Sequence, residues 1–200
     1  MKESINLKEI RRQVVLYYAE DGLADIAIGT VILGFGLLLL LDLPALVGLL
    51  GLAGILVWYG GKKALVIPRV GSIQPGRELK QRFQGFFINL ALIGVGFLVL
   101  ILLSRRAGSL ELSSYSLAIF GLVVGLGISS LGLLLDAGRF YAYGLLVFLA
   151  LAGGEFLGRS VSGFDPFLAA VIGAGSLIIL AGVIVLARFL GKYPVIRLGE

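Results

Sequence analysis

The sequence predicts an all-α integral membrane protein with six transmembrane helices arranged as three helical hairpins, preceded by an interfacial amphipathic helix. Three observations predict this fold class. Of the 200 residues, 58% are hydrophobic and 14% are charged, and the mean hydropathy is +1.04, whereas a soluble domain of this size needs more polar surface. The apolar residues fall into runs about as long as a bilayer is thick. The Lys and Arg residues lie almost entirely in alternate loops, as membrane topology requires.

Residues 1–21 are predicted to form an amphipathic helix that lies on the cytoplasmic interface. Leu7, Ile10 and Val14 recur at helical spacing, while basic residues fall on another face. The segment is too polar for the apolar region of a cleavable signal peptide. The alternative is a solvated helix that simply precedes the first span.

Residues 22–200 are predicted to form the six-span bundle, since a span needs about 20 mostly apolar residues. The run from Gly22 to Gly61 is too long for one crossing, and Asp42-Leu43-Pro44 predicts the turn of a helical hairpin within it. A basic cytoplasmic loop is expected at 62–83, where Pro68 and Pro75-Gly76 favour an extended piece and a turn. The spans are expected near residues 22–41, 44–61, 84–103, 115–135, 141–158 and 166–187.

The distribution of basic residues predicts that both termini are cytoplasmic. With the N-terminus inside, all 17 Lys and Arg residues except Arg105, Arg106 and Arg159 fall in cytoplasmic segments. This is the asymmetry that orients multi-pass proteins. Aromatic residues gather at the predicted span ends, which is typical of interfacial belts. We expect a multi-pass protein of the plasma (inner) membrane of a prokaryote.

A weak internal repeat favours three stacked hairpins. Each odd-numbered span opens with aromatic residues followed by glycine, at residues 17–22, 82–85 and 139–144. All three hairpins would have the same topology, so a symmetry axis would run along the membrane normal. The alternative is convergence, because every inner end favours aromatic and basic residues.

Small residues indicate where helices contact one another. Lipid tails are as apolar as Leu, so close packing rather than burial must hold the spans together. A four-residue spacing places small residues on one helix face, which suits either a contact within the bundle or a dimer interface. The candidate helix-packing residues are Gly121, Gly125 and Ser129 in the fourth span, and Gly154 and Gly158 in the fifth.

The candidate intramembrane polar site consists of Asp25, Asn89, Glu155 and Arg159, because polar and ionisable groups within spans are functional candidates by default. Asp25 lies in the first turn of the first span, where the helix dipole stabilises a carboxylate. Together with Asp21 it either has a structural role at the helix end or forms a cation or proton site on the cytoplasmic side. Glu155 precedes Arg159 by four residues, so we expect a local ion pair. The alternatives for Glu155 are a substrate or ion contact and a contact between subunits.

The 62–83 loop carries the densest charge, and such clusters bind anionic lipid headgroups or act only as topology signal. The candidate anionic-lipid contacts are Lys62, Lys63, Arg69, Arg77, Lys80 and Arg82. We expect the bilayer, including anionic headgroups, as the partner of these residues, and no nucleic acid.

The functional expectation rests largely on the residue types and motifs that the sequence lacks. The chain has no Cys and no His, which removes thiol nucleophiles, imidazole bases and the usual zinc sites. It also has no P-loop and no G-x-S-x-G motif. We therefore expect no enzyme, no cofactor and no metal. The expected function is that of a helical-bundle scaffold or accessory subunit that self-associates or packs on a membrane partner. The alternative is a small ion or solute transporter or channel that uses Asp25, Asn89 or Glu155.

Overall fold

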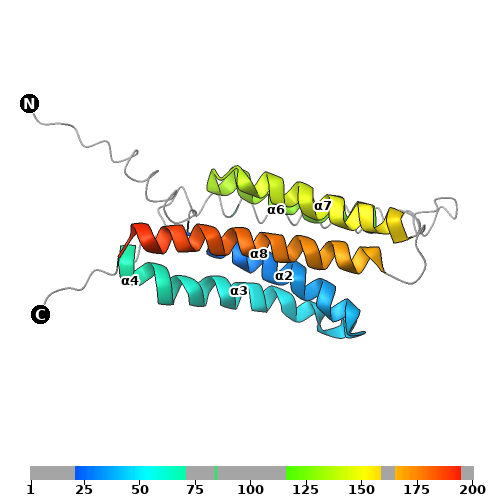
Figure 1. Ribbon diagram of the computed structural model, residues 1–200, viewed down its shortest axis with the longest axis horizontal. Coiled ribbons are helices and arrows are strands. Elements are labelled where there is room, and N and C mark those ends of the chain that lie inside the picture. The colour runs from blue at the N-terminus through cyan, green and yellow to red at the C-terminus, as the bar shows by residue number, and fades with distance from the viewer. Residues whose placement is uncertain (1–20, 71–83, 85–115, 159–164, 195–200) are drawn as a thin grey trace, which may run out of the picture.

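The computed structural model describes residues 21–70, 84, 116–158 and 165–194, and in these residues every regular element is a helix (Figure 1). The expectation of an all-α chain is therefore confirmed for this part of the sequence. The elements are α2 (Leu23–Leu40), the 3₁₀-helix η1 (Pro44–Leu49), α3 (Leu50–Gly61), the π-helical turn η2 (Lys62–Val66), α4 (Ile67–Val70), α6 (Ser116–Leu135), α7 (Arg139–Gly158) and α8 (Pro166–Lys192).

Four helical segments of the described chain are long and apolar enough to cross a membrane, and α7 adds a shorter apolar stretch, Arg139–Gly154. The four segments are Leu23–Leu40, Ala45–Arg69, Ala118–Leu135 and Pro166–Lys192. The predicted third span, 84–103, and the predicted amphipathic helix, 1–21, lie outside the described residues except for Gln84 and Asp21.

Two of the long helices end in the same way. Asp42 after α2 and Asp136 after α6 have φ values of 56° and 52°, the left-handed conformation that Asp tolerates better than most residues. The Leu43 N–H then donates to the Leu38 carbonyl at 2.8 Å, and the Ala137 N–H donates to the Gly132 carbonyl at 3.1 Å. These bonds satisfy carbonyls that a helix end leaves free and turn the chain back on itself.

The helix that follows the first turn is longer than expected. We expected a loop from residue 62, with Pro68 starting an extended piece, but the chain stays helical through η2 and α4 to Val70. Pro68 lacks an N–H and its ring collides with the carbonyl of the turn before it. The wide turn η2, closed by the Ile67 N–H donating to the Lys62 carbonyl, ends at Val66, so the helix is widened just before the turn that contains Pro68.

The helices are antiparallel neighbours: α2 packs on α3 and α8, and α7 packs on α6 and α8. The neighbours α2 and α3, and likewise α6, α7 and α8, follow each other along the described chain. The closest of these pairs is α2 with α8, from the two ends of the described chain (Figure 1).

Glycines set the close approach of α2 to α8. A Cβ on Gly29 would lie 2.8 Å from the Ile179 nitrogen and 2.9 Å from the Gly175 oxygen, and one on Gly175 would lie 2.5 Å from the Leu33 nitrogen. Backbone atoms of the two helices are thus in contact, an arrangement that only residues without a side chain permit. The glycines of this contact are Gly22, Gly29 and Gly36 on α2 and Gly175 and Gly182 on α8, and those on each helix are seven residues apart.

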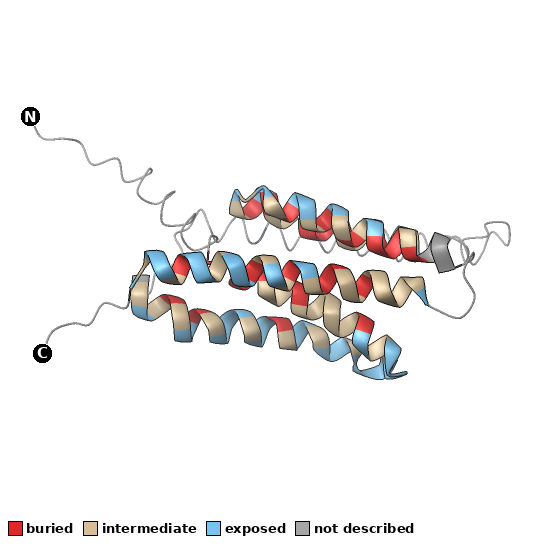
Figure 2. Cartoon of the chain, viewed as in Figure 1, coloured by how far each residue is buried: buried red, intermediate tan, exposed pale blue. Residues whose placement is uncertain are grey.

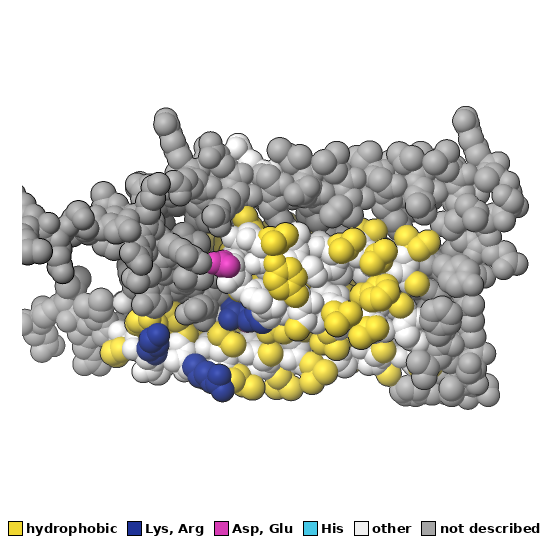
Figure 3. Space-filling model, turned by 90° about the horizontal axis from the view of Figure 1, so that it is seen from above, with side chains coloured by type: hydrophobic (Ala, Val, Ile, Leu, Met, Phe, Trp, Pro, Cys, Tyr) yellow, Lys and Arg dark blue, Asp and Glu magenta, His cyan; other side chains and the backbone are white. Residues whose placement is uncertain are grey.

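All Lys and Arg residues that the structure describes gather at one end of the bundle, which we call the basic end. The start of α2 contacts the end of α3, the start of α7 and the end of α8, so these four helix ends meet there. Figure 3 shows blue side chains toward one end of the displayed face. The basic residues are Lys62, Lys63, Arg69, Arg139, Arg188 and Lys192.

Large apolar side chains cover the outer faces of the helices. Figure 2 shows exposed residues along the outward sides and buried residues between the helices. In the apolar 18-residue window of Ala45–Arg69 only 11% of the residues are buried, against 28% in Leu23–Leu40. Faces of this kind suit a lipid environment or contact with another membrane protein. The exposed residues include Leu52, Ile55 and Leu56 on α3, Leu122 and Leu126 on α6, Leu145 and Leu149 on α7, and Leu180 and Ile184 on α8.

Candidate functional site

Four charged side chains from three parts of the bundle meet at the basic end, and we call them the charge quartet: Asp21, Asp25, Lys62 and Arg139. The exposed fraction is 0% for Asp21, 0% for Asp25 and 7% for Lys62. Buried charges are rare unless they are paired. Here two carboxylates face two cations, so the formal charges of these four described residues cancel.

Asp25, in the first turn of α2, pairs with Arg139 at the start of α7. The Arg139 Nε–H donates to Asp25 Oδ1 at 3.1 Å, and Nε also lies 3.0 Å from Oδ2. Oδ2 accepts no hydrogen bond from the described residues, because the N–H points toward Oδ1. The Arg139 side chain is 24% exposed, so the pair lies at the edge of the bundle and joins α2 to α7.

Asp21, directly before α2, pairs with Lys62 at the end of α3. Asp21 Oδ1 accepts a hydrogen bond from the Leu23 N–H at 3.0 Å, and Oδ2 lies 3.3 Å from Lys62 Nζ. Lys62 Nζ also lies 5.1 Å from the centre of the Trp58 ring, a cation–π contact. Burial raises the pKa of the Asp21 carboxyl, although the charge of Lys62 and the Leu23 hydrogen bond act in the opposite direction.

Gly22 shapes the chain where it enters α2. Its φ is 76°, a conformation that glycine adopts without strain. A Cβ at this position would overlap the Gly182 carbonyl and lie 2.8 Å from the Leu186 nitrogen of α8. The turn and the close approach of α8 therefore both require glycine, and together they place Asp21 and Asp25 inside the bundle.

The predicted polar site is described only in part. Asp25 lies in the charge quartet, whereas Asn89, Arg159 and the side chain of Glu155 lie outside the described residues. The predicted ion pair of Glu155 with Arg159 and the grouping of the four residues as one site therefore stay predictions.

The predicted lipid contacts need one correction. Lys62 is buried against Asp21 rather than displayed on a loop, because the helix continues past residue 62 and carries its side chain inward. Lys63 is exposed. Arg69 Nη1 donates to the Leu65 carbonyl of its own helix at 2.7 Å. Arg77, Lys80 and Arg82 lie outside the described residues.

The predicted packing residues lie at two helix contacts. A Cβ on Gly121 would lie 2.8 Å from the Leu151 Cβ, and one on Gly125 would lie 2.7 Å from the Gly144 oxygen, so both face α7 from α6. Ser129 lies on the same face, beside Gly144. A Cβ on Gly154 would lie 2.6 Å from the Phe167 Cα of α8, and Gly158 ends α7.

Sequence reasoning missed both ion pairs of the charge quartet. It took Asp25 with Asp21 either as a structural helix end or as a cation or proton site, and it placed Lys62 in a loop. A signal was present: the two acids are four residues apart at the start of a predicted span, and Lys62 and Arg139 stand at the cytoplasmic ends of predicted spans. Buried acids at one membrane face need cations from the same face.

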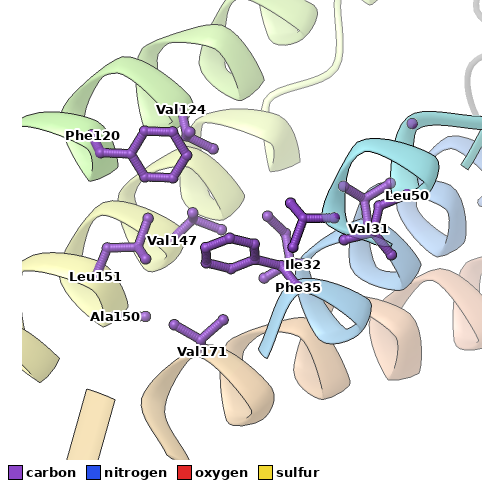
Figure 4. A pocket seen from close by; sticks show the side chains of 12 residues that line it. Val31, Ile32, Phe35, Leu50, Phe120, Val124, Val147, Ala150, Leu151 and Val171 are labelled. Atoms are coloured by element: carbon purple, nitrogen blue, oxygen red, sulfur yellow. The ribbon is translucent and has the colours of Figure 1, made fainter. Parts of the chain in front are cut away.

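An apolar cavity of about 200 Å³ lies deeper in the bundle (Figure 4). Its described lining comes from α2, η1, α3, α6, α7 and α8 and contains only Val, Ile, Leu, Phe, Ala and Gly. Phe35 of α2 and Phe120 of α6 both line it and pack against each other, with ring centres 6.2 Å apart. Along α2, Val31 is six residues beyond Asp25, which is about 9 Å at the rise of a helix.

The chemistry available to the described residues is limited. They contain no group of three or more acidic side chains that could hold a metal ion. The quartet can exchange ionic partners or hold three helices together. The cavity can hold an apolar group.

No protein-family model, no curated protein and no solved structure matches the chain at a significant level. The function must therefore be argued from the residues themselves.

Proposed function

We propose that the chain is a six-span membrane protein with both termini in the cytoplasm, and that it acts as a helical-bundle scaffold or accessory subunit. The observation that carries this proposal is the distribution of polar groups. The charges buried in the described bundle are paired at one end, and the deeper core consists of side chains such as Ile128, Val147 and Ile178. Such an interior favours packing over transport, because polar groups line the routes of ions and solutes.

The path of the chain supports six spans. Val70 lies at the basic end and Ser116 at the opposite end, because α6 runs antiparallel to α7 and α7 starts at the basic end. The connecting residues must therefore pass from one end to the other, about 30 Å for a helix as long as α6. The predicted span at 84–103 has the length and composition for this crossing.

The orientation follows from the positive-inside rule. Because every described Lys and Arg lies at the basic end, this end faces the cytoplasm in the proposed topology. The chain has no Cys, so single-cysteine variants report position without background. In intact cells, an impermeant maleimide is expected to label Leu43→Cys, at the turn between α2 and η1, and to leave Lys63→Cys unlabelled until the cells are opened. Labelling of Lys63→Cys from outside would refute the orientation.

The outer face of α3 is the proposed association surface. It carries Leu52, Ile55 and Leu56, which are 59%, 60% and 69% exposed, and its segment is the least buried of the candidate spans. Exposed apolar surface of this extent marks contact with lipid or with a partner.

Cysteine crosslinking in native membranes tests the association. Ile55→Cys on α3 is expected to give a dimer or a larger adduct, while Leu180→Cys, equally exposed on α8, stays monomeric. A monomeric product from both variants, together with a monomeric mass in lipid nanodiscs, would contradict the scaffold proposal.

A second candidate function, a small transporter or channel, is favoured by one observation: two carboxylates are fully buried within the bundle at its basic end. If the protein transports an ion, proteoliposomes show a flux that Asp25→Asn abolishes and Arg188→Gln, a change of an exposed cation at the same end, leaves intact. The scaffold proposal predicts no flux above that of empty vesicles.

A further inference from the structure

We propose that the apolar cavity is a binding site for the terminal segment of a lipid acyl chain. Its volume, about 200 Å³, is comparable with engineered apolar cavities of about 150 Å³, which stay free of water and bind small apolar molecules. No described lining residue offers a polar side chain, so this part of the lining gives water or a polar ligand no side-chain partner.

The depth of the cavity identifies its occupant. On α2 the cavity reaches from Val31 to Phe35, close to the middle of a helix that runs from Leu23 to Leu40. On α7 it reaches from Val147 to Leu151, again near the middle. Val47 of η1, Leu50 of α3 and Val171 of α8 lie near the start of their segments, so the cavity extends from the middle of the bundle toward the end opposite the basic end. The middle of a spanning helix lies near the bilayer midplane. The ends of acyl chains from both leaflets meet there, and they are the most abundant apolar groups at that depth.

The rim of the cavity is continuous with the lipid-facing surface. Gly51, at the start of α3, lines the cavity and is itself exposed, and a Cβ on it would meet no atom within 4 Å. Its neighbours Leu49 and Leu52 are 56% and 59% exposed. A chain end that lies against α3 can therefore pass Gly51 and reach Phe35 without crossing a polar surface.

Photocrosslinking in vesicles tests this site. The purified protein is reconstituted into phosphatidylcholine that contains a trace of a phospholipid with a diazirine near the end of one acyl chain, and adducts are mapped by mass spectrometry. We expect adducts on cavity residues such as Val124 and Val147, in addition to adducts on outward residues such as Leu149, which is 55% exposed.

A filled cavity provides the decisive comparison. Ala150→Leu places extra volume in the cavity, and Ala142→Leu makes the same change on the exposed face of α7. The cavity adducts are expected to disappear in Ala150→Leu and to remain in Ala142→Leu, while the Leu149 adduct remains in both.

Two results would overturn the proposal. One is labelling restricted to outward residues in the unaltered protein. The other is cavity labelling that persists in a filled variant with an unchanged melting temperature. If Ala150→Leu does not fold, Val124→Phe fills the same cavity from α6, and the same outcomes apply. The result does not depend on whether the protein is a scaffold or a transporter, because the measurement involves only the bilayer and the chain.

Discussion

Removing Arg139 from the charge quartet gives the sharpest test of the structure. Arg139→Gln leaves the Asp25 carboxylate at 0% exposure without its cation. At 3.0 Å and an effective dielectric constant of about 20, the attraction lost is on the order of 5 kcal/mol. Because Arg139 is 24% exposed, we expect a loss near the lower end of the range for broken buried pairs, about 3 kcal/mol.

The two partners of this pair are expected to respond unequally. Asp25→Asn leaves the Arg139 guanidinium with a path to water, so the loss is smaller, about 1–2 kcal/mol. Replacing both partners by apolar residues, Asp25→Leu with Arg139→Met, removes both charges and is expected to recover most of the stability, to within about 1 kcal/mol of the original. Arg188→Gln, at an exposed position of the same end, is the control and is expected to change stability by less than about 0.5 kcal/mol.

The assay is equilibrium unfolding in mixed micelles, with the fluorescence of Trp58 as the signal. Trp58 is the single tryptophan of the chain, and its ring contacts Lys62 of the quartet. The fluorescence therefore reports the end of the bundle that the substitutions perturb. If Arg139→Gln and Asp25→Asn each shift stability no more than Arg188→Gln and their effects simply add, the pair is not formed and the reasoning fails.

Three further predictions concern stability. Gly29→Ala places a methyl group against two backbone atoms of α8, so we expect a loss of about 2 kcal/mol or more in the same unfolding assay, whereas Gly173→Ala, with open space around it, is expected to be neutral or slightly stabilising. Burial raises the pKa of Asp21, so the folded protein holds this proton more tightly than the unfolded chain; the associated stability is present at low pH and is lost as the pH rises above about 4. Asp21→Asn is expected to flatten this part of the pH profile, and an unchanged profile would contradict the burial of the carboxyl. Asp165→Ala removes the acceptor of two N–H groups at the start of α8, at 3.0 and 3.3 Å, and is expected to lower the melting midpoint by the equivalent of about 1 kcal/mol.

The helices of this chain could be predicted from sequence because their signals are local. Apolar runs and turn residues are properties of short windows, and the helices α2, α6 and α7 begin and end close to the predicted bounds. Asp42, in the turn predicted after the first span, stands where the structure turns. Pro68 misled the prediction because its usual effect is to break a helix, and a wide turn that absorbs it leaves no clear mark in the sequence.

The partners of the buried acids could not be predicted in the same way. Asp25 and Arg139 are 114 residues apart, and nothing near either residue indicates which helices become neighbours. The glycine contact of α2 with α8 could not be predicted for the same reason, because the two helices are far apart in the sequence. The predicted packing residues did not include the glycines of α8, where Gly175 meets α2 while Gly173, two residues before it, faces open space. Residues two apart point to opposite sides of a helix, so only the seven-residue spacing of Gly22, Gly29 and Gly36 marks the true face.

The contact between α2 and α8 also has a consequence for the order in which the protein assembles. In the proposed topology α2 enters the membrane during synthesis long before α8 exists, because more than a hundred residues separate them. The glycine face of α2 therefore cannot pack on α8 until α8, one of the last segments of the bundle, is inserted. Contacts between segments so distant in the chain form late and slowly. Completion of the bundle is thus tied to completion of the chain as far as α8, and a nascent chain that stops before this helix leaves α2 without the surface that holds it.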